Sequence, residues 1–278
     1  MLIDEKTMMQ MHEKQFEMFC VLKEVMDKMG IKYYFVHGSL LGAVTIEDFI
    51  LEDDDIDIAV FRKDYERLIT EGNDYLPTNY FIQSSLNDDF PLAFAKIRDN
   101  NTAFIQPVLN NYKCNKGIYI DIFPIDYQVE GKISNLLFSF RERLLSERIN
   151  GRLLRVKRRS ILDIILNLTG YIRYPFYKQA IQKREELYIS LKKTNLVRIT
   201  NGKSKEKSMP REWFGQGEMH QFHGIQVNCP DNYDAYLKRI YSEDYLHFNP
   251  AHKRINQNRI EVSADTIDFE KSYQDYNR

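Results

Sequence analysis

An acidic run is the feature of this sequence with the clearest chemistry. Seven of the eleven residues in segment 47–57 are acidic, and the last two of them, Asp55 and Asp57, adjoin the apolar stretch 58–60. A solvated loop is the ordinary interpretation of such a run, but carboxylates among apolar residues are costly unless they are paired or bind a cation. Because residues two apart in a strand project from one face, we expect Asp53, Asp55 and Asp57 to form one row.

Such a row suits one or two Mg²⁺ ions, with Mn²⁺ as the alternative, in a site that transfers phosphoryl groups. An EF-hand calcium loop is the competing metal site. It is excluded by its register, because its sixth position would be Ile58 instead of glycine and its twelfth Asp64 instead of glutamate. Asp121 supplies a further carboxylate within a later apolar stretch, residues 119–123.

Two other segments offer contacts for phosphates. Gly38 and Ser39 follow a predicted strand and open a predicted helix, which would direct backbone N–H groups and the Ser39 hydroxyl to a phosphate. Lys96 and Arg98 fall on one face of a later predicted strand, either as a clamp for the donor phosphates or as a solvated strand edge. A strand, a Gly-Ser turn, a helix and an Asp-x-Asp strand in this order are typical of nucleotidyltransferase folds.

These residues need a framework, and hydropathy periodicity predicts one. Apolar positions three and four apart, closed by Gly30, predict a long helix over residues 5–29. We expect strands over residues 33–36, 55–61, 80–83, 92–97 and 118–123, the last ended by Pro124, and helices after Ser39 and over residues 63–71. The predicted class is α+β, with a nucleotidyltransferase-like mixed β-sheet core, flanking helices and a helical insert.

The chain divides into three predicted regions: a catalytic core in residues 1–130, a basic helical insert in residues 131–200, and a segment in residues 201–278 that packs back on the core. Within residues 141–159, eight basic residues stand against two acidic ones, a net charge of +6. A solvated face of the insert is one interpretation. Peripheral contact with an anionic inner membrane leaflet is the other.

Composition limits the remaining classes. The net charge of −1 gives no global attraction to nucleic acid, and we expect no nucleic-acid partner. Cys20, Cys114 and Cys229 stand far apart without a CxxC pair, which argues against a disulfide framework or a structural zinc site and favours a reducing compartment. No apolar stretch approaches the length of a membrane span. We therefore expect a cytoplasmic protein, with peripheral contact at the inner membrane face as the open alternative.

Four motifs, in order and spacing, resemble the LicD family, which is similar to fukutin and the fukutin-related protein. They are Gly38-Ser39-Leu40-Leu41-Gly42-Ala43-Val44, Asp53-Asp54-Asp55-Ile56-Asp57-Ile58, Lys96-Ile97-Arg98-Asp99 and Asp121-Ile122-Phe123-Pro124-Ile125-Asp126. Weaker similarity extends over residues 213–215, 222–224 and 233–237. The sequence departs from the family pattern at residues 45–52, where the family usually has Arg-His and a Pro-Trp turn.

The resemblance implies Mg²⁺ and transfer of a phosphoalcohol from a CDP-activated donor, typically CDP-choline, to a sugar of a cell-surface glycan such as teichoic acid, lipopolysaccharide or capsule. The acceptor would be a glycan or a lipid-linked glycan. By this resemblance the metal ligands are Asp53, Asp55, Asp57 and Asp121. We further expect Gly38, Ser39, Lys96, Arg98 and Asp99 to contact substrate, and Asp126 or Asp99 to accept the proton of the attacking hydroxyl.

Three other functions share these features. A glycosyltransferase or a nucleotidyltransferase could use the same Asp-x-Asp metal site with a nucleotide-activated donor, and a scaffold could retain the fold without activity. The clustered carboxylates argue against a scaffold. Choline, ethanolamine, ribitol and glycerol all remain open as the transferred alcohol.

Overall fold

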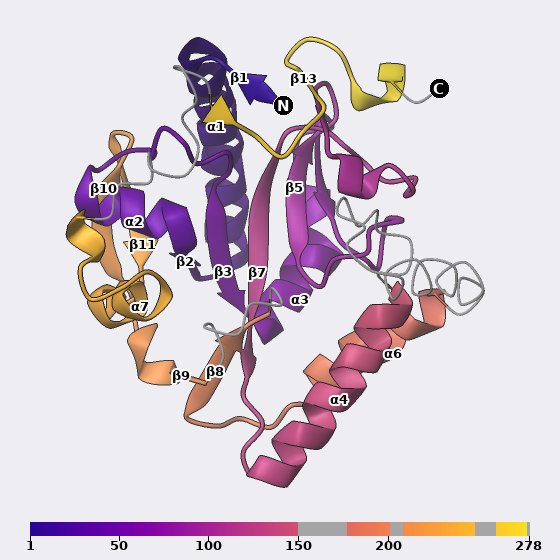
Figure 1. The fold of residues 1–278 in the computed structure, drawn as a ribbon, viewed down its shortest axis with the longest axis vertical. Coiled ribbons are helices and arrows are strands. Elements are labelled where there is room, and N and C mark those ends of the chain that lie inside the picture. Colours follow the sequence, from indigo (N-terminus) through magenta and orange to yellow (C-terminus); the bar gives the residue numbers. More distant parts are fainter. Residues whose placement is uncertain (150–176, 201–207, 248–259, 277–278) are drawn as a thin grey trace.

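A mixed β-sheet forms the centre of the molecule (Figure 1). The computed structural model describes residues 1–149, 177–200, 208–247 and 260–276. The sheet has the strand order β2 (Tyr33–Phe35), β3 (Asp57–Phe61), β7 (Tyr119–Tyr127), β5 (Ala95–Asp99) and β4 (Tyr80–Gln83), and β7 also pairs with β8 (Leu196–Ile199), which pairs with β9 (Met209–Pro210). Only β3 and β7 run parallel among these pairs. The expected α+β class with a mixed sheet is therefore confirmed.

Smaller pairs of strands surround the sheet. They are β1 (Leu2–Ile3) with β12 (Ile260–Glu261), β6 (Ala103–Ile105) with β13 (Thr266–Asp268), and the hairpin of β10 (Glu218–Phe222) and β11 (Ile225–Cys229). Short 3₁₀ segments are η1 (Gly72–Tyr75), η2 (Pro107–Leu109), η5 (Arg211–Trp213), η6 (Tyr245–His247) and η8 (Tyr273–Tyr276). Pairing of β13 with β6 brings the end of the chain onto its first half.

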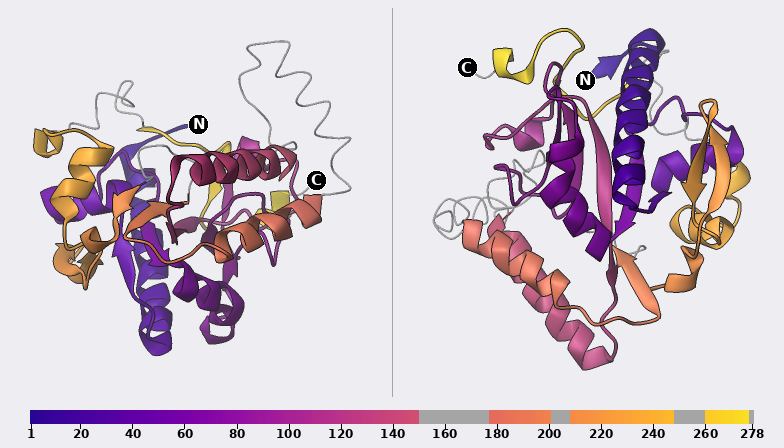
Figure 2. Two further views of the ribbon diagram at one scale, coloured as in Figure 1. Left: turned by 90° about the horizontal axis from the view of Figure 1, so that it is seen from below. Right: turned by 180° about the vertical axis from the view of Figure 1, so that it is seen from behind.

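Helices cover the sheet and its edges. They are α1 (Glu5–Met29), α2 (His37–Thr45), α3 (Arg62–Glu71), α4 (Lys132–Ile149), α6 (Tyr177–Ile189) and α7 (Tyr233–Ile240). The view from behind shows α1 and α3 lying across one face of the sheet, while α4 and α6 pack together beyond its lower end (Figure 2, right). Among the described residues, no helix is long and apolar enough to cross a bilayer.

The long helix α1 forms where the periodicity predicts it. The Asp4 side chain accepts a hydrogen bond from the backbone N–H of Thr7, which satisfies one of the free donors at the helix start. Gly30 ends the helix at φ +64°, a left-handed conformation that glycine adopts without steric cost. The apolar face is fully buried against the sheet, and each large side chain there contributes about 1.5–3 kcal/mol.

Three predicted strand boundaries are wrong. The strand expected from Asp55 begins at Asp57, and the one expected over residues 92–97 is Ala95–Asp99. Pro124 does not end its strand, because β7 continues to Tyr127. Pro124 lies at the end of the β7–β8 pairing, where its carbonyl oxygen accepts a 3.0 Å hydrogen bond from the backbone N–H of Thr200 and only the return bond is missing.

The predicted insert contributes α4 and α6, which share a second apolar core with the first part of the chain. Phe138 and Ile149 of α4 belong to the same buried cluster as Phe90 and Tyr112. The Tyr112 hydroxyl donates a hydrogen bond to the carbonyl oxygen of Ile149. Residues 150–159 of the basic stretch lie outside the described residues.

Candidate functional site

Three carboxylates meet where β3 begins beside β7. One oxygen each from Asp55, Asp57 and Asp121 can be chosen so that all three lie within 4.8 Å of one another. Asp57 and Asp121 are direct partners in the parallel register of β3 and β7, so their side chains project from the same face. Asp55 precedes β3 in the loop and is half-buried, whereas Asp57 and Asp121 are buried. We call this cluster the acidic triad.

The triad is electrostatically costly without a cation. Burial, followed by repulsion from Asp57, raises the pKa of Asp55 well above its usual range. Burial also raises the pKa of Asp121, against the opposing effect of Lys96. Oxygen-only ligands that repel one another in a half-buried site are the donor set that a hard divalent cation prefers. The residues therefore fit a divalent metal site, with Asp55, Asp57 and Asp121 as its protein ligands.

The first turn of α2 supports Asp57 directly. The Ser39 hydroxyl accepts a hydrogen bond of 2.8 Å from the backbone N–H of Asp57. His37, at φ +51°, places its Nδ1 3.2 Å from Asp57 Oδ2. The Ser39 side chain, expected to face a phosphate, is buried and used in this way to position the start of β3. Sequence spacing alone does not reveal this use.

Asp53 is not part of the triad. Because β3 begins only at Asp57, strand alternation does not extend back to Asp53. Its carboxylate lies against the backbone of Gly38, where an added Cβ would come within 1.8 Å of Asp53 Oδ2. A side chain at position 38 would therefore have to displace the Asp53 carboxylate. The structure brings together three of the four expected metal ligands and places the fourth beside the α2 turn.

Two polar residues of α1 hold the backbone of the acidic loop. His12 Nε2 donates a 2.8 Å hydrogen bond to the carbonyl oxygen of Asp53. Gln15 Nε2 donates to the carbonyl oxygens of Asp54, at 2.9 Å, and Tyr119, at 3.2 Å. Gln15 thus joins the loop that carries Asp55 to the strand that carries Asp121. Neither residue is among those predicted from the sequence, although two polar residues three apart on the apolar face of a helix are a signal that could have found them.

We expect Gln15→Leu to weaken divalent-metal binding about tenfold, since the loss of a hydrogen bond that orients ligands typically costs 10–100-fold in metal affinity. Titration of Mn²⁺ followed by calorimetry measures the change. Gln10→Leu, at an exposed position of the same helix, is the matched control and should bind like the unaltered protein. Equal affinities of the two variants would contradict the assigned role.

The divergent segment 45–52 is fastened to α1 and the β10–β11 hairpin. The Phe49 ring stacks on His12, with centroids 4.3 Å apart, and contacts Phe222 at 4.7 Å. Asp48 Oδ1 lies 2.8 Å from His223 Nδ1. His12 also binds the carbonyl oxygen of Asp53 in the acidic loop. Segment 45–52, which departs from the usual family pattern, is therefore held beside the candidate metal site.

Lys96 belongs to the site, whereas Arg98 and Asp99 lie farther along β5. The buried Lys96 ammonium is paired with Asp121 and lies 3.3 Å from the centroid of the Tyr119 ring. Arg98 is fully buried and donates to Gln83 Oε1, at 2.9 Å, and to a backbone carbonyl. Asp99 is buried and paired with Lys14 of α1 at 3.0 Å. Of the two residues predicted to clamp the donor phosphates, Lys96 lies next to the triad, whereas the Arg98 side chain is buried in the interior and bonded to protein groups.

Asp126 lies away from the triad. It is five residues beyond Asp121 on β7, so strand alternation directs the two carboxylates to opposite faces. Arg62 of α3 binds Asp126 in a bidentate pair, at 2.6 Å and 2.7 Å, and the Thr200 hydroxyl also donates to it. Arg62 in addition contacts Glu185 of α6 at 3.3 Å. A carboxylate held in this way is a structural group, and we do not retain Asp126 as the expected proton acceptor.

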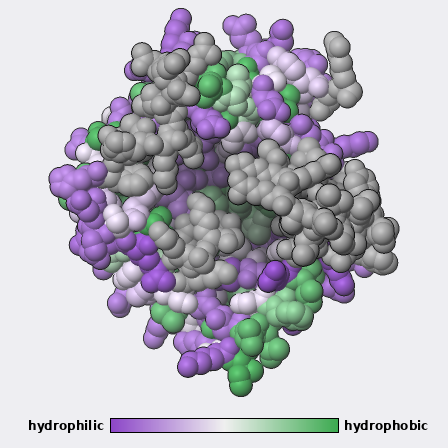
Figure 3. Space-filling view, viewed as in Figure 1, coloured by the Kyte–Doolittle hydropathy of each residue, from purple (hydrophilic) through white to green (hydrophobic). Residues whose placement is uncertain are grey.

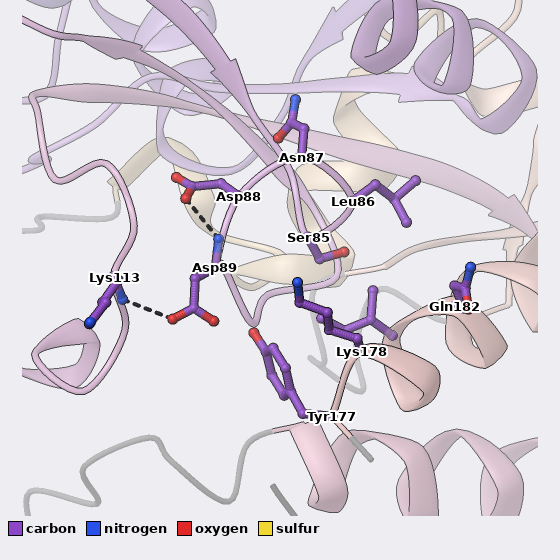
Figure 4. Close-up of a pocket in the computed structure, with 10 residues that line it drawn as sticks. Ser85, Leu86, Asn87, Asp88, Asp89, Lys113, Tyr177, Lys178 and Gln182 are labelled. Atoms are coloured by element: carbon purple, nitrogen blue, oxygen red, sulfur yellow. Dashed lines mark hydrogen bonds between the residues drawn. The ribbon is translucent and has the colours of Figure 1, made fainter. Parts of the chain in front are cut away.

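A separate surface cavity of about 730 Å³ lies between residues 85–89, Lys113 and the start of α6 (Figure 4). Its acidic side chains bind the backbone: Asp88 Oδ1 accepts from the N–H of Asp89, and Asp89 Oδ2 accepts from the N–H of Lys113. The triad is not among the described residues that line this cavity. The volume alone therefore does not locate the chemistry.

Comparison with known proteins agrees with this geometry. Residues 30–149, which include the whole triad and Lys96, match the family model described as LicD/FKTN/FKRP, nucleotidyltransferase domain. The chain is 25% identical over 233 residues to the lipopolysaccharide cholinephosphotransferase LicD of Haemophilus influenzae, a match that covers 81% of this chain and 85% of that protein. The parallel Asp57–Asp121 pair lies within the matched segment, so the part of this chain that carries the triad is similar to the LicD family.

Proposed function

We propose that this protein is a Mg²⁺-dependent phosphotransferase that moves a phosphoalcohol from a CDP-activated donor to a sugar of a cell-surface glycan. Phosphocholine is the phosphoalcohol that we propose first. The observation that carries the proposal is the acidic triad, with Asp57 and Asp121 on adjacent parallel strands and Asp55 in the loop before β3, within a segment that matches the LicD model. The name of the Haemophilus influenzae relative supports choline as the alcohol and lipopolysaccharide as one class of acceptor.

In this proposal Asp55, Asp57 and Asp121 hold Mg²⁺, with Mn²⁺ as the alternative. The ion, when bound, supplies positive charge for the phosphates of the donor. The ammonium group of Lys96 provides a second positive charge beside Asp121. The Ser39 hydroxyl holds the backbone N–H of Asp57 in place. In the reaction, the acceptor hydroxyl oxygen forms a bond to the β-phosphorus of the donor, the bond between that phosphorus and the oxygen of the CMP group breaks, CMP leaves with the electron pair, and the hydroxyl proton passes to solvent.

Product analysis tests the proposal. The purified protein is incubated with an acceptor glycan, Mg²⁺ and, in separate reactions, CDP-choline, CDP-ribitol, CDP-glycerol and UDP-glucose. We expect CMP release from one CDP-alcohol, loss of that release in EDTA, and its recovery on addition of Mg²⁺. Heat-treated protein is the control for spontaneous hydrolysis.

The alternative functions predict other products. Release of a nucleoside diphosphate would identify a glycosyltransferase, and release of pyrophosphate from a nucleoside triphosphate would identify a nucleotidyltransferase, the activity for which the matched domain is named. Either product without CMP release would refute the phosphotransferase.

A further inference from the structure

The helix α4 has two apolar faces, of which only one is buried. Phe138, Leu145 and Ile149 lie in the core shared with α6. On another face, large side chains at spacings of three, four, seven and eleven residues are exposed: Ile133 by 77%, Leu136 by 70%, Leu137 by 59%, Phe140 by 60% and Leu144 by 49%. We call these five residues the α4 stripe. Exposed apolar side chains scattered singly are ordinary, but a contiguous stripe indicates an interaction surface.

Basic residues border the α4 stripe on both sides. With 3.6 residues per turn, Arg141 and Arg148 lie along one border, and Lys132 and Arg143 along the other. All four are exposed. Their arrangement around the stripe is that of a helix that lies in the plane of a membrane interface.

The acidic residue Glu142 is directed to the protein interior. Its carboxylate is bound by Arg198 of β8 at 2.6 Å and by the Tyr188 hydroxyl of α6 at 2.9 Å. The helix as a whole carries four basic residues against Glu142 and Glu147. Glu147, seven residues after Phe140, falls on the stripe side of the helix, so with the four basic residues this side has a net charge of +3, against −1 for the whole chain.

We propose that α4 docks the protein on an anionic lipid surface, with the α4 stripe inserted among the acyl chains nearest the headgroups and the four basic side chains at the lipid phosphates. Charge favours this occupant over a second copy of the chain. Two copies packed stripe to stripe would bring their basic borders together, whereas an anionic bilayer complements both borders at once. The proposal does not rest on the proposed function.

The orientation of the stripe is consistent with docking by a whole face of the protein. Apolar side chains gather over α4 at the lower edge of the face shown in Figure 3. A membrane that contacts α4 would thus lie beside this face, and no spanning segment is needed for attachment.

Flotation with lipid vesicles at physiological ionic strength tests the proposal. The full chain is mixed with vesicles of phosphatidylglycerol and phosphatidylcholine, or of phosphatidylcholine alone. We expect partition into the anionic vesicles only. Phe140→Glu should weaken this partition at least tenfold, and Arg141→Gln and Arg148→Gln about fivefold each, because a basic residue near an anionic surface contributes about 1 kcal/mol.

Matched variants on α1 separate docking from general effects. Met9→Glu introduces the same charge at a helix residue that is 55% exposed, and Lys28→Gln removes a basic residue that is exposed on the same helix. Both should partition like the unaltered protein, and circular dichroism should show all variants folded. The proposal is overturned if the unaltered protein ignores anionic vesicles, binds neutral ones equally well, or instead forms a dimer that Phe140→Glu dissociates.

Discussion

Asp55→Asn is expected to abolish transfer, with a loss in kcat on the order of 10³-fold, and to make the metal-free protein more stable. The carboxylate is one of three that can hold the cation, and removing several kcal/mol of transition-state stabilisation accounts for a loss of this size. The gain in stability has a separate cause. Burial removes water from the Asp55 carboxylate and the neighbouring carboxylates repel it, and an amide of the same shape removes both costs.

The sign of the pH dependence follows from the raised pKa. A carboxyl group whose folded-state pKa exceeds its ordinary value of 3.8 opposes folding once the pH rises above that value, because the unfolded chain ionises more readily. The metal-free protein should therefore lose stability from this group as the pH rises from 3.8 through the raised pKa. Mg²⁺ should restore the stability, and Asp55→Asn should remove both effects.

Thermal unfolding with EDTA or Mg²⁺, metal titration and the CMP-release assay measure these outcomes together. Asp244→Asn, at an exposed site, is the matched control and should change none of them. Asp53→Asn distinguishes the triad from the expected set of four metal ligands, since we expect it to retain metal binding better than Asp55→Asn. Unchanged transfer by folded Asp55→Asn would refute the metal site.

Asp126→Asn is expected to cost about 3–5 kcal/mol of unfolding free energy, because it leaves the buried Arg62 guanidinium without its bidentate partner. The network that it breaks joins β7, α3 and α6, so the loss falls on the global fold. The part of the sample that remains folded should retain kcat within a few fold, since Asp126 does not face the triad.

Denaturant unfolding and kcat per folded molecule distinguish the two roles of Asp126. The surface pair Lys23–Asp27, at 2.7 Å, provides the control: Asp27→Asn removes an exposed carboxylate and should cost under about 1 kcal/mol. A folded, normally stable Asp126→Asn protein that has lost transfer would mean that Asp126 acts in catalysis after all.

Local sequence pattern predicted most of the framework and all three members of the triad. The apolar period and the capping residues of α1 specify that helix without reference to the remainder of the chain. Asp57 and Asp121 stand out because each is a carboxylate at the edge of, or within, an apolar strand, where burial makes an unpaired charge expensive. That cost depends only on neighbours in sequence, so it is visible before the fold is known.

Tertiary structure decided which carboxylates act together. Asp53 and Asp126 have the same residue type and a similar local sequence to the triad residues, but neither joins the triad. Strand β3 begins only at Asp57, so its alternation does not include Asp53. The Asp126 carboxylate is bound by Arg62 of α3. Gln15 reaches the site through a hydrogen bond to Tyr119, 104 residues away. Strand alternation and hydropathy are local properties of a sequence. Strand ends, ion-pair partners and the helix that closes over a loop depend on segments far apart in the chain, and these become neighbours only when the core packs.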